Sequence, residues 1–173
     1  ARLNNTLAAN QNLSFDGNAL LWQRGGASPE VWRTTFEVST NAANWTILGA
    51  GERVPGGWRL GSISLSTNAM VRARGFTTGG QYNASSWFVE SSLAMDPRTP
   101  PRIKTDDSSF GIRSNAFGFN LVALQGQTVV VEASPNLTDW VTILTNSISF
   151  TPLYVSEPIG TNFSIRFYRA RLR

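Results

Sequence analysis

Hydrophobic and polar residues alternate along short stretches of this chain, with a period of two. The clearest case is the segment 32–38, where one predicted face consists of alternate residues: Trp32, Thr34, Phe36 and Val38. Such alternation is typical of an antiparallel strand with one buried face. No stretch has the apolar spacing of an amphipathic helix, and Gly, Asn, Ser and Thr recur every few residues as turn signals.

The same pattern predicts further strands along the whole chain. They cover residues 18–24, 45–48, 58–65, 70–76, 86–91, 115–124, 128–133, 140–145, 148–155 and 164–172. Within 58–65 the inward parity changes at Gly61, which predicts a bulge at that residue. Many short strands separated by turns are typical of an antiparallel sandwich or barrel. We therefore expect an all-β fold built from antiparallel β-sandwiches.

The strand pattern stops at Asp96-Pro97-Arg98-Thr99-Pro100-Pro101. Proline cannot donate a hydrogen bond to a sheet, and it stiffens the chain. We therefore expect a Pro-rich linker at 95–102. It would join one β-sandwich module at 12–94 to a C-terminal β-sandwich module at 103–173, with 1–11 left as a tail.

An internal repeat supports two related modules. Glu37-x-Ser39-x-Asn41-x-x-x-Trp45 recurs 95 residues later as Glu132-x-Ser134-x-Asn136-x-x-x-Trp140, and Leu48 then corresponds to Ile143 or Leu144. Downstream, Val71-Arg72-Ala73-Arg74 matches Tyr168-Arg169-Ala170-Arg171 at an offset of 97. Two motifs in the same order at nearly the same offset indicate a duplication.

Each repeated motif predicts a hairpin whose return strand opens with a tryptophan. The favoured interpretation places Trp45 and Trp140 between two sheets, as parts of the core. A ligand platform is the alternative. In the later strand, the paired arginines are expected to point away from the core.

Composition removes several kinds of chemistry. The chain has no His and no Cys, so it lacks the commonest general base, the thiol nucleophile and the usual zinc ligands. Asp106 and Asp107 are adjacent and would point apart on an extended chain, which makes them a poor catalytic pair. Together with Ser108 and Ser109 they are the best local candidate for a calcium-binding loop. The favoured interpretation is a solvated turn. We expect no catalytic, cofactor or metal site.

The net charge of +4 comes from 15 Lys and Arg against 11 Asp and Glu, and Lys104 is the only lysine. The arginines are scattered, with no basic run of the kind that binds nucleic acid. No apolar run is long enough for a membrane span. We therefore expect neither nucleic acid nor a membrane span among the partners.

A sugar-binding surface is the main functional alternative. Aromatic side chains in loops at one end of a sandwich can stack on pyranose rings. The candidates are Trp58 in Gly56-Gly57-Trp58-Arg59, Tyr82 in Gly79-Gly80-Gln81-Tyr82-Asn83, and Trp87. Core packing explains each of them equally well.

Two stretches resemble modules of a known family. The first consists of Trp22-Gln23-Arg24-Gly25-Gly26, Ser28-Pro29-Glu30-Val31, Gly56-Gly57-Trp58 and Val71-Arg72-Ala73-Arg74-Gly75. It resembles the module that follows the propeller-like repeats of bacterial delta-60 repeat proteins. The second consists of Phe117-Gly118-Phe119-Asn120, Val129-Val130-Val131-Glu132-Ala133-Ser134, Asp139-Trp140 and Phe167-Tyr168-Arg169. It resembles a C-terminal module of large exported proteins from Verrucomicrobia.

The resemblance implies fibronectin type III-like or immunoglobulin-like sandwiches in an exported protein. Ala1-Arg2-Leu3-Asn4 is similar to the end of one delta-60 repeat, so 1–11 would be the tail of an upstream repeat and Arg173 would lie near the true C-terminus. We expect a non-catalytic structural or adhesive module, extracellular or on the cell surface, with an assembly, anchoring or export role. Its partners would be other modules or copies of itself, bound through edge strands. Polysaccharide is the alternative partner.

Overall fold

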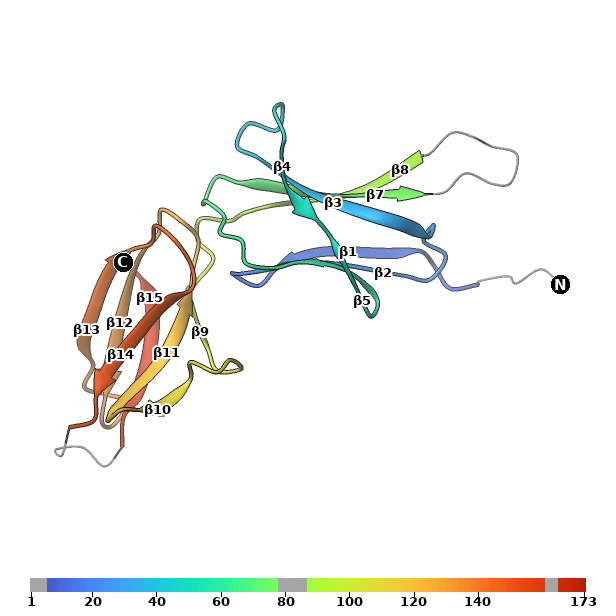
Figure 1. Cartoon of the computed structure of the whole chain (residues 1–173). Helices are drawn as coiled ribbons and strands as arrows, with labels where there is room; N and C mark the ends of the chain where they lie inside the picture. Colours follow the sequence, from blue (N-terminus) through green and yellow to red (C-terminus); the bar gives the residue numbers. More distant parts are fainter. Residues whose placement is uncertain (1–5, 78–86, 161–164) are drawn as a thin grey trace. The chain divides into compact units, whose positions relative to one another are not determined.

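The computed structural model describes residues 6–77, 87–160 and 165–173. All regular structure in these ranges is β-strand, arranged in antiparallel sheets (Figure 1). The predicted all-β sandwich class is therefore confirmed. No helix occurs within the described ranges, and so none that could span a membrane. By contacts the chain divides into a first unit, residues 1–63 and 68–95, and a second unit, residues 64–67 and 96–173.

The first unit contains two four-stranded sheets. The strand orders are β1-β2-β6-β5 and β4-β3-β7-β8. Their bounds are β1 Asn10–Phe15, β2 Leu20–Gly25, β3 Val31–Ser39, β4 Thr46–Ala50, β5 Glu52–Val54, β6 Gly57–Leu60, β7 Met70–Thr77 and β8 Trp87–Ala94.

The core of the first unit lies between these two sheets. Trp22 of β2 is fully buried, and its Nε1 donates a hydrogen bond to Ser91 Oγ of β8 at 2.8 Å. Phe36 of β3 is equally buried on the opposite sheet. Gly75 of β7 lies directly under the Trp22 ring: a Cβ there would be 2.7 Å from Trp22 Cζ3. The absence of a side chain at Gly75 therefore lets the indole of one sheet pack on the backbone of the other.

Strand β3 departs from the predicted alternation at its start. A bulge between Val31 and Arg33 gives β3 one extra residue against β7. As a result Val31 and Thr34 are buried, whereas Trp32 and Arg33 are both exposed. The prediction that Trp32 shares the buried face of Phe36 is wrong, because a bulge reverses the parity of the residues that precede it.

The second unit contains one sheet of β9, β10, β11 and β14 and another in the order β13-β12-β15. Their bounds are β9 Arg102–Lys104, β10 Gly111–Arg113, β11 Ala116–Val122, β12 Thr128–Ser134, β13 Val141–Ser147, β14 Leu153–Pro158 and β15 Phe167–Leu172. Phe119 and Leu121 of β11 pack with Val129 and Val131 of β12, so the core again lies between two sheets.

The Pro-rich segment is attached to the second unit. The side-chain amide of Gln127 donates to the carbonyl oxygens of Pro97 and Thr99, at 3.0 and 2.8 Å. Gln127 itself is buried, with 5% exposure. Its oxygen accepts a hydrogen bond from the backbone N–H of Leu124 at 2.9 Å. One glutamine thus satisfies three backbone groups near the start of β12.

Several boundaries differ from those predicted. Strand β6 ends at Leu60, so the strand expected over 58–65 stops at Gly61 instead of continuing through a bulge. The strand expected over 148–155 begins only at Leu153, after Pro152, which has no N–H to donate to a ladder. The short strands β5, β9 and β10 and the N-terminal strand β1 lie where no strand was predicted.

Candidate functional site: arginine ladders on the outer sheet faces

Both repeated hairpins use the same turn. The Asn41 side-chain oxygen accepts hydrogen bonds from the backbone N–H groups of Ala43 and Asn44, at 3.0 and 2.9 Å. The Asn136 oxygen accepts from Thr138 and Asp139, at 3.0 and 2.9 Å. An asparagine that bonds to backbone groups two and three residues ahead closes the chain into a turn without help from the rest of the fold.

The turn also fixes each tryptophan. Trp45 Nε1 donates to the carbonyl of Ala42 at 3.2 Å, and Trp140 Nε1 donates to that of Leu137 at 2.9 Å. Ala42 and Leu137 both have positive φ angles, 59° and 66°. This left-handed conformation is uncommon for residues other than glycine, and here it points one carbonyl at each indole.

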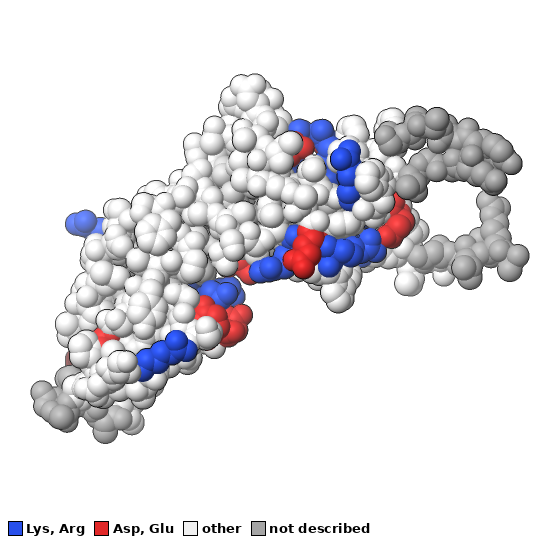
Figure 2. Space-filling model, viewed as in Figure 1, with Lys and Arg blue, Asp and Glu red and all other residues white. Residues whose placement is uncertain are grey.

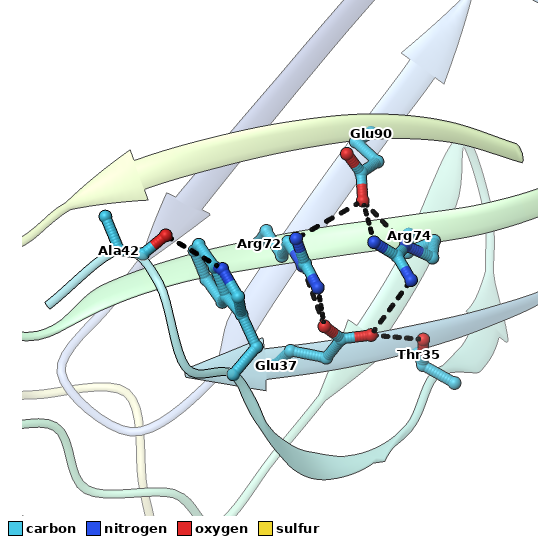
Figure 3. A network of polar contacts seen from close by, with 7 residues as sticks. Thr35, Glu37, Ala42, Arg72, Arg74 and Glu90 are labelled. Atoms are coloured by element: carbon cyan, nitrogen blue, oxygen red, sulfur yellow. Dashed lines mark hydrogen bonds and ion pairs between the residues drawn. The ribbon is translucent and has the colours of Figure 1, made fainter. Parts of the chain in front are cut away.

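In the first unit, the outer face of β3, β7 and β8 carries a compact ion-pair network (Figure 3). Glu37 accepts a hydrogen bond from Arg72 Nε at 2.7 Å, and its other oxygen lies 4.0 Å from Arg74 Nη1. Glu90 accepts from Arg74 Nε at 2.6 Å and lies 3.7 Å from Arg72 Nη1. Two carboxylates and two guanidinium groups therefore neutralise one another across three strands.

Trp45 closes one end of this network. The Arg72 guanidinium carbon lies 4.1 Å from the centroid of the Trp45 ring. A guanidinium can stack its face on an indole while its edge donates to a carboxylate. Arg72 does both, since its Nε reaches Glu37. We call the set Trp45, Glu37, Arg72, Arg74 and Glu90 the first ladder.

The second unit repeats the Trp–Arg–Glu contacts on β12 and β15, with Trp140 directly before β13. Arg169 Nε donates to Glu132 at 2.7 Å, and Arg171 Nη2 donates to the other Glu132 oxygen at 3.1 Å. The Arg169 guanidinium lies 4.1 Å from the Trp140 ring. These hydrogen bonds from Arg171 and Arg169 lower the pKa of Glu132. We call Trp140, Glu132, Arg169 and Arg171 the second ladder.

Sheet register explains why the two ladders match. Glu37 pairs with Arg72 and Glu132 pairs with Arg169. Bulges fall at the same place, between Phe36 and Glu37 in one sheet and between Val131 and Glu132 in the other. In this register Leu48 corresponds to Ile143, which resolves the alternative between Ile143 and Leu144.

The tryptophans of the ladders are not core residues. Trp45 and Trp140 are half-buried and lie over arginines on the outer faces of their sheets. The favoured interpretation, a plug between two sheets, is therefore wrong for both. The expected outward direction of Arg72, Arg74, Arg169 and Arg171 agrees with the structure, since each bonds to an outer-face glutamate.

Beyond the first ladder, the outer face of the same sheet carries Trp32, Arg33, Phe76 and Phe88, and the ring of Trp87 lies next to that of Phe88 at the edge strand β8. We call these five residues the aromatic strip. Arg33 pairs with Phe76, which pairs with Phe88 on the next strand. The Arg33 guanidinium lies 4.0 Å from the Phe76 ring and 4.9 Å from that of Trp32. The rings of Phe88 and Trp87 are stacked, with centroids 6.2 Å apart.

The three residues proposed as a sugar platform have different positions. Trp58 is buried, with 7% exposure, and packs beside Phe36 around Gly51. It therefore cannot offer a ring face at the surface. Tyr82 lies outside the described residues. Trp87 is 74% exposed, and its ring lies next to that of Phe88, a neighbour that the sequence pattern did not indicate. Only knowledge of the bulge would have added Trp32 to this group.

The second unit also has a pocket of about 280 Å³ at one end of its sandwich. The Arg166 guanidinium makes two hydrogen bonds to the Glu157 carboxylate, which also accepts from Tyr168 Oη at 2.9 Å. Burial raises the pKa of Glu157, but these hydrogen bonds outweigh it and the net pKa is lowered. Burial and the bond to Glu157 raise the pKa of Tyr168 to about 12.

The acidic residues Asp106 and Asp107 lie in a turn in which Asp107 accepts hydrogen bonds from neighbouring groups. Asp107 accepts hydrogen bonds from Asn120 Nδ2 and from the backbone N–H of Ser109, both at 2.9 Å. These bonds, that from Asn120 first, lower its pKa. Asp106 lies 3.9 Å from Lys104 Nζ. Across the described ranges no cluster of three or more acidic residues is suited to a metal ion.

Charge on the face shown in Figure 2 is mixed: basic and acidic side chains lie next to one another. This follows from the ladders, in which each glutamate has arginine neighbours.

Comparison with known proteins does not assign this chain to a family. No family model matches the chain, and no curated protein matches it.

Proposed function

We propose that this chain is a non-catalytic structural or adhesive module of a larger exported bacterial protein. In this proposal two related β-sandwich modules stand in tandem, and the protein belongs with the exported delta-60 repeat proteins that its sequence resembles. The single observation that carries the proposal is the repeated ladder, with the same turn, the same bulge and the same Trp–Arg–Glu contacts in each unit. Proteins built from repeated structural units commonly act through extended surfaces that the repeats form together, which fits a structural or adhesive role.

The state of the glutamates supports a non-catalytic role. A general acid needs a raised pKa, so that it holds a proton near neutral pH. Glu132 and Glu157 have lowered pKa values because arginines donate hydrogen bonds to them. Their carboxylates are thus held ionised as partners of arginine. This arrangement stabilises a sheet surface and leaves these groups poorly suited to proton transfer.

Edge strands give the module a way to join its neighbours. Strand β13 is at the edge of its sheet, and it contains neither proline nor a charged residue. Its first residue, Val141, is 61% exposed. Strand β4 is the corresponding edge in the first unit, where Ile47 is 68% exposed. An uncharged edge strand presents backbone donors and acceptors to which another strand can pair.

The test is light scattering of the purified chain over a range of concentrations, at physiological salt. We expect the mass to rise with concentration, and Val141→Lys to suppress that rise, because a charge on an edge strand blocks pairing. Phe150→Lys is the matched control: Phe150 is 62% exposed but lies outside the strands. A chain that remains monomeric throughout, or equal effects of the two substitutions, would overturn the edge-strand proposal.

A further inference from the structure

The aromatic strip is an exposed surface beside the first ladder, and the two meet where the Arg74 guanidinium lies 4.5 Å from the centroid of the Phe88 ring. Trp32, Trp87 and Phe88 are 56%, 74% and 42% exposed. Removing ring surface from water is favourable, so exposed rings that lie close together can stabilise a bound ligand. Such a patch, rimmed by polar groups, is typical of a binding surface.

The geometry of the strip suits an extended ligand. Arg33, Phe76 and Phe88 lie side by side on β3, β7 and β8, so they cross two inter-strand spacings, roughly 10 Å. Trp32 lies beside Arg33 at one end, and Trp87 stacks on Phe88 at the other. The β3 bulge is what makes the strip continuous, because it moves Trp32 from the buried parity to the side of Arg33.

The charge of the strip differs from that of the adjoining ladder. Arg72 and Arg74 are neutralised by Glu37 and Glu90. Arg33 contacts two rings, and it has no ion pair within the described part of the chain. Its edge donors therefore remain available, and a guanidinium edge fits a carboxylate with two parallel hydrogen bonds. The strip thus combines flat apolar rings with one positive charge.

We propose that the aromatic strip binds an acidic polysaccharide, with ring faces against the sugar rings and Arg33 paired to a uronate carboxylate. This inference rests on the adhesive function proposed above and names its ligand class. Charge complementarity selects an acidic glycan over a neutral one. Single-stranded nucleic acid also stacks on aromatics, but it needs a positively charged groove along its backbone, and the neighbouring arginines of this face are already paired with glutamates.

Isothermal titration of the whole chain with polygalacturonate tests the proposal, with methyl-esterified polygalacturonate as the neutral probe on the same backbone. We expect binding to the acidic polymer and at least about fivefold weaker binding to the ester. Trp32→Ala and Trp87→Ala should each weaken binding by roughly five- to tenfold, the effect of one aromatic contact. Arg33→Gln should reduce binding of the acidic polymer to the level of the ester.

Phe150→Ala is the matched control, since it removes an exposed aromatic ring far along the chain from the strip, and it should leave affinity unchanged. Thermal unfolding of each variant checks that it folds. The proposal is overturned if the acidic polymer does not bind, if Trp32→Ala binds as tightly as the parent chain, or if a single-stranded oligonucleotide binds more tightly. Light scattering without glycan reports self-association separately, so failure of the glycan proposal is distinguishable from failure of the edge-strand proposal.

Discussion

The indole ring of Trp140 lies over the guanidinium of Arg169, with 4.1 Å between the Arg169 Cζ atom and the ring centroid. The edge of the same guanidinium donates to Glu132 at 2.7 Å. Arg169 therefore uses its face for one neighbour and its edge for another, which a lysine ammonium cannot do. The Trp45–Arg72 pair repeats this relationship at the same distance.

The Trp140–Arg169 contact should appear as a measurable coupling. A double-mutant cycle of Trp140→Ala and Arg169→Ala, followed by urea unfolding, should give a coupling free energy of about 0.5–1 kcal/mol, the range for partly exposed cation–π pairs. Trp140→Phe should retain part of it, because a smaller ring remains under the guanidinium. Strictly additive effects of the two alanine substitutions would contradict this contact.

Glu37 should matter more to stability than Glu90. The Glu37 side chain is 9% exposed and that of Glu90 is 34% exposed, although both contact Arg72 and Arg74. Removing the buried carboxylate leaves charge without a buried partner, so Glu37→Ala should cost about 1–3 kcal/mol of unfolding free energy. Glu90→Ala should cost less than about 1 kcal/mol. Equal losses in chemical denaturation would show that burial does not set the difference.

Acid should weaken the second unit through Glu132. Its folded-state pKa is lowered by Arg171 and Arg169, so the carboxylate contributes stability that is complete above the unfolded pKa, about 4.3. That contribution is lost as the pH falls through the lower folded-state pKa. Glu132→Gln should therefore flatten the dependence of the melting temperature on pH below about 4.5. Asp106→Asn, which changes a carboxylate that is 73% exposed, serves as the control and should leave that slope nearly unchanged.

Tyr168 should ionise late. Burial and the hydrogen bond to Glu157 raise its pKa to about 12, against an ordinary value of about 10. The neutral phenol is favoured in the folded state, so stability is unaffected below about pH 10 and falls as the pH rises from there toward the folded-state pKa. An ultraviolet titration of phenolate should lose its latest step in Tyr168→Phe. Tyr154→Phe, at a residue that is 52% exposed, should keep that step.

Gly75 should not accept a side chain. A Cβ at this position would lie 2.7 Å from Trp22 Cζ3 and 2.8 Å from Val31 Cγ1, both in the core. Gly75→Ala should therefore destabilise the chain by about 1–3 kcal/mol through overpacking. Gly49→Ala is the comparison, since its nearest contact is Leu60 Cδ1 at 3.1 Å, the end of a flexible side chain. Thermal unfolding of the two variants measures the difference, and an equal or smaller loss for Gly75→Ala would contradict the packing.

Sequence alone predicts the sandwich class and the repeat of the two motifs, because both depend on local periodicity and on matched spacings. The contacts among Trp, Arg and Glu that form the ladders were not predicted. The strand predicted at 32–38 follows from alternation and lies within β3. The outward direction of the arginines follows from the parity of the later strand in each repeat. The position of Trp32 could not be predicted, since a bulge depends on how β3 aligns with β7 and leaves no mark in β3 itself. The prediction that Trp45 and Trp140 lie in the core is wrong for a related reason. Each ring is partly covered by an arginine of another strand on the outer face of the sheet, and the local pattern does not indicate this contact.

The extra residue in β3 makes the exposed side chains of this strand independent of the alternation that sets its buried side chains. Phe36 and Thr34 are buried while Trp32 is exposed, because the bulge places the extra residue of β3 outside the core. We therefore expect substitutions at position 32 to change the surface with little effect on the packing below. In protein design, residues on the outer face of this sheet could be changed to create a new binding surface while the core residues stay the same.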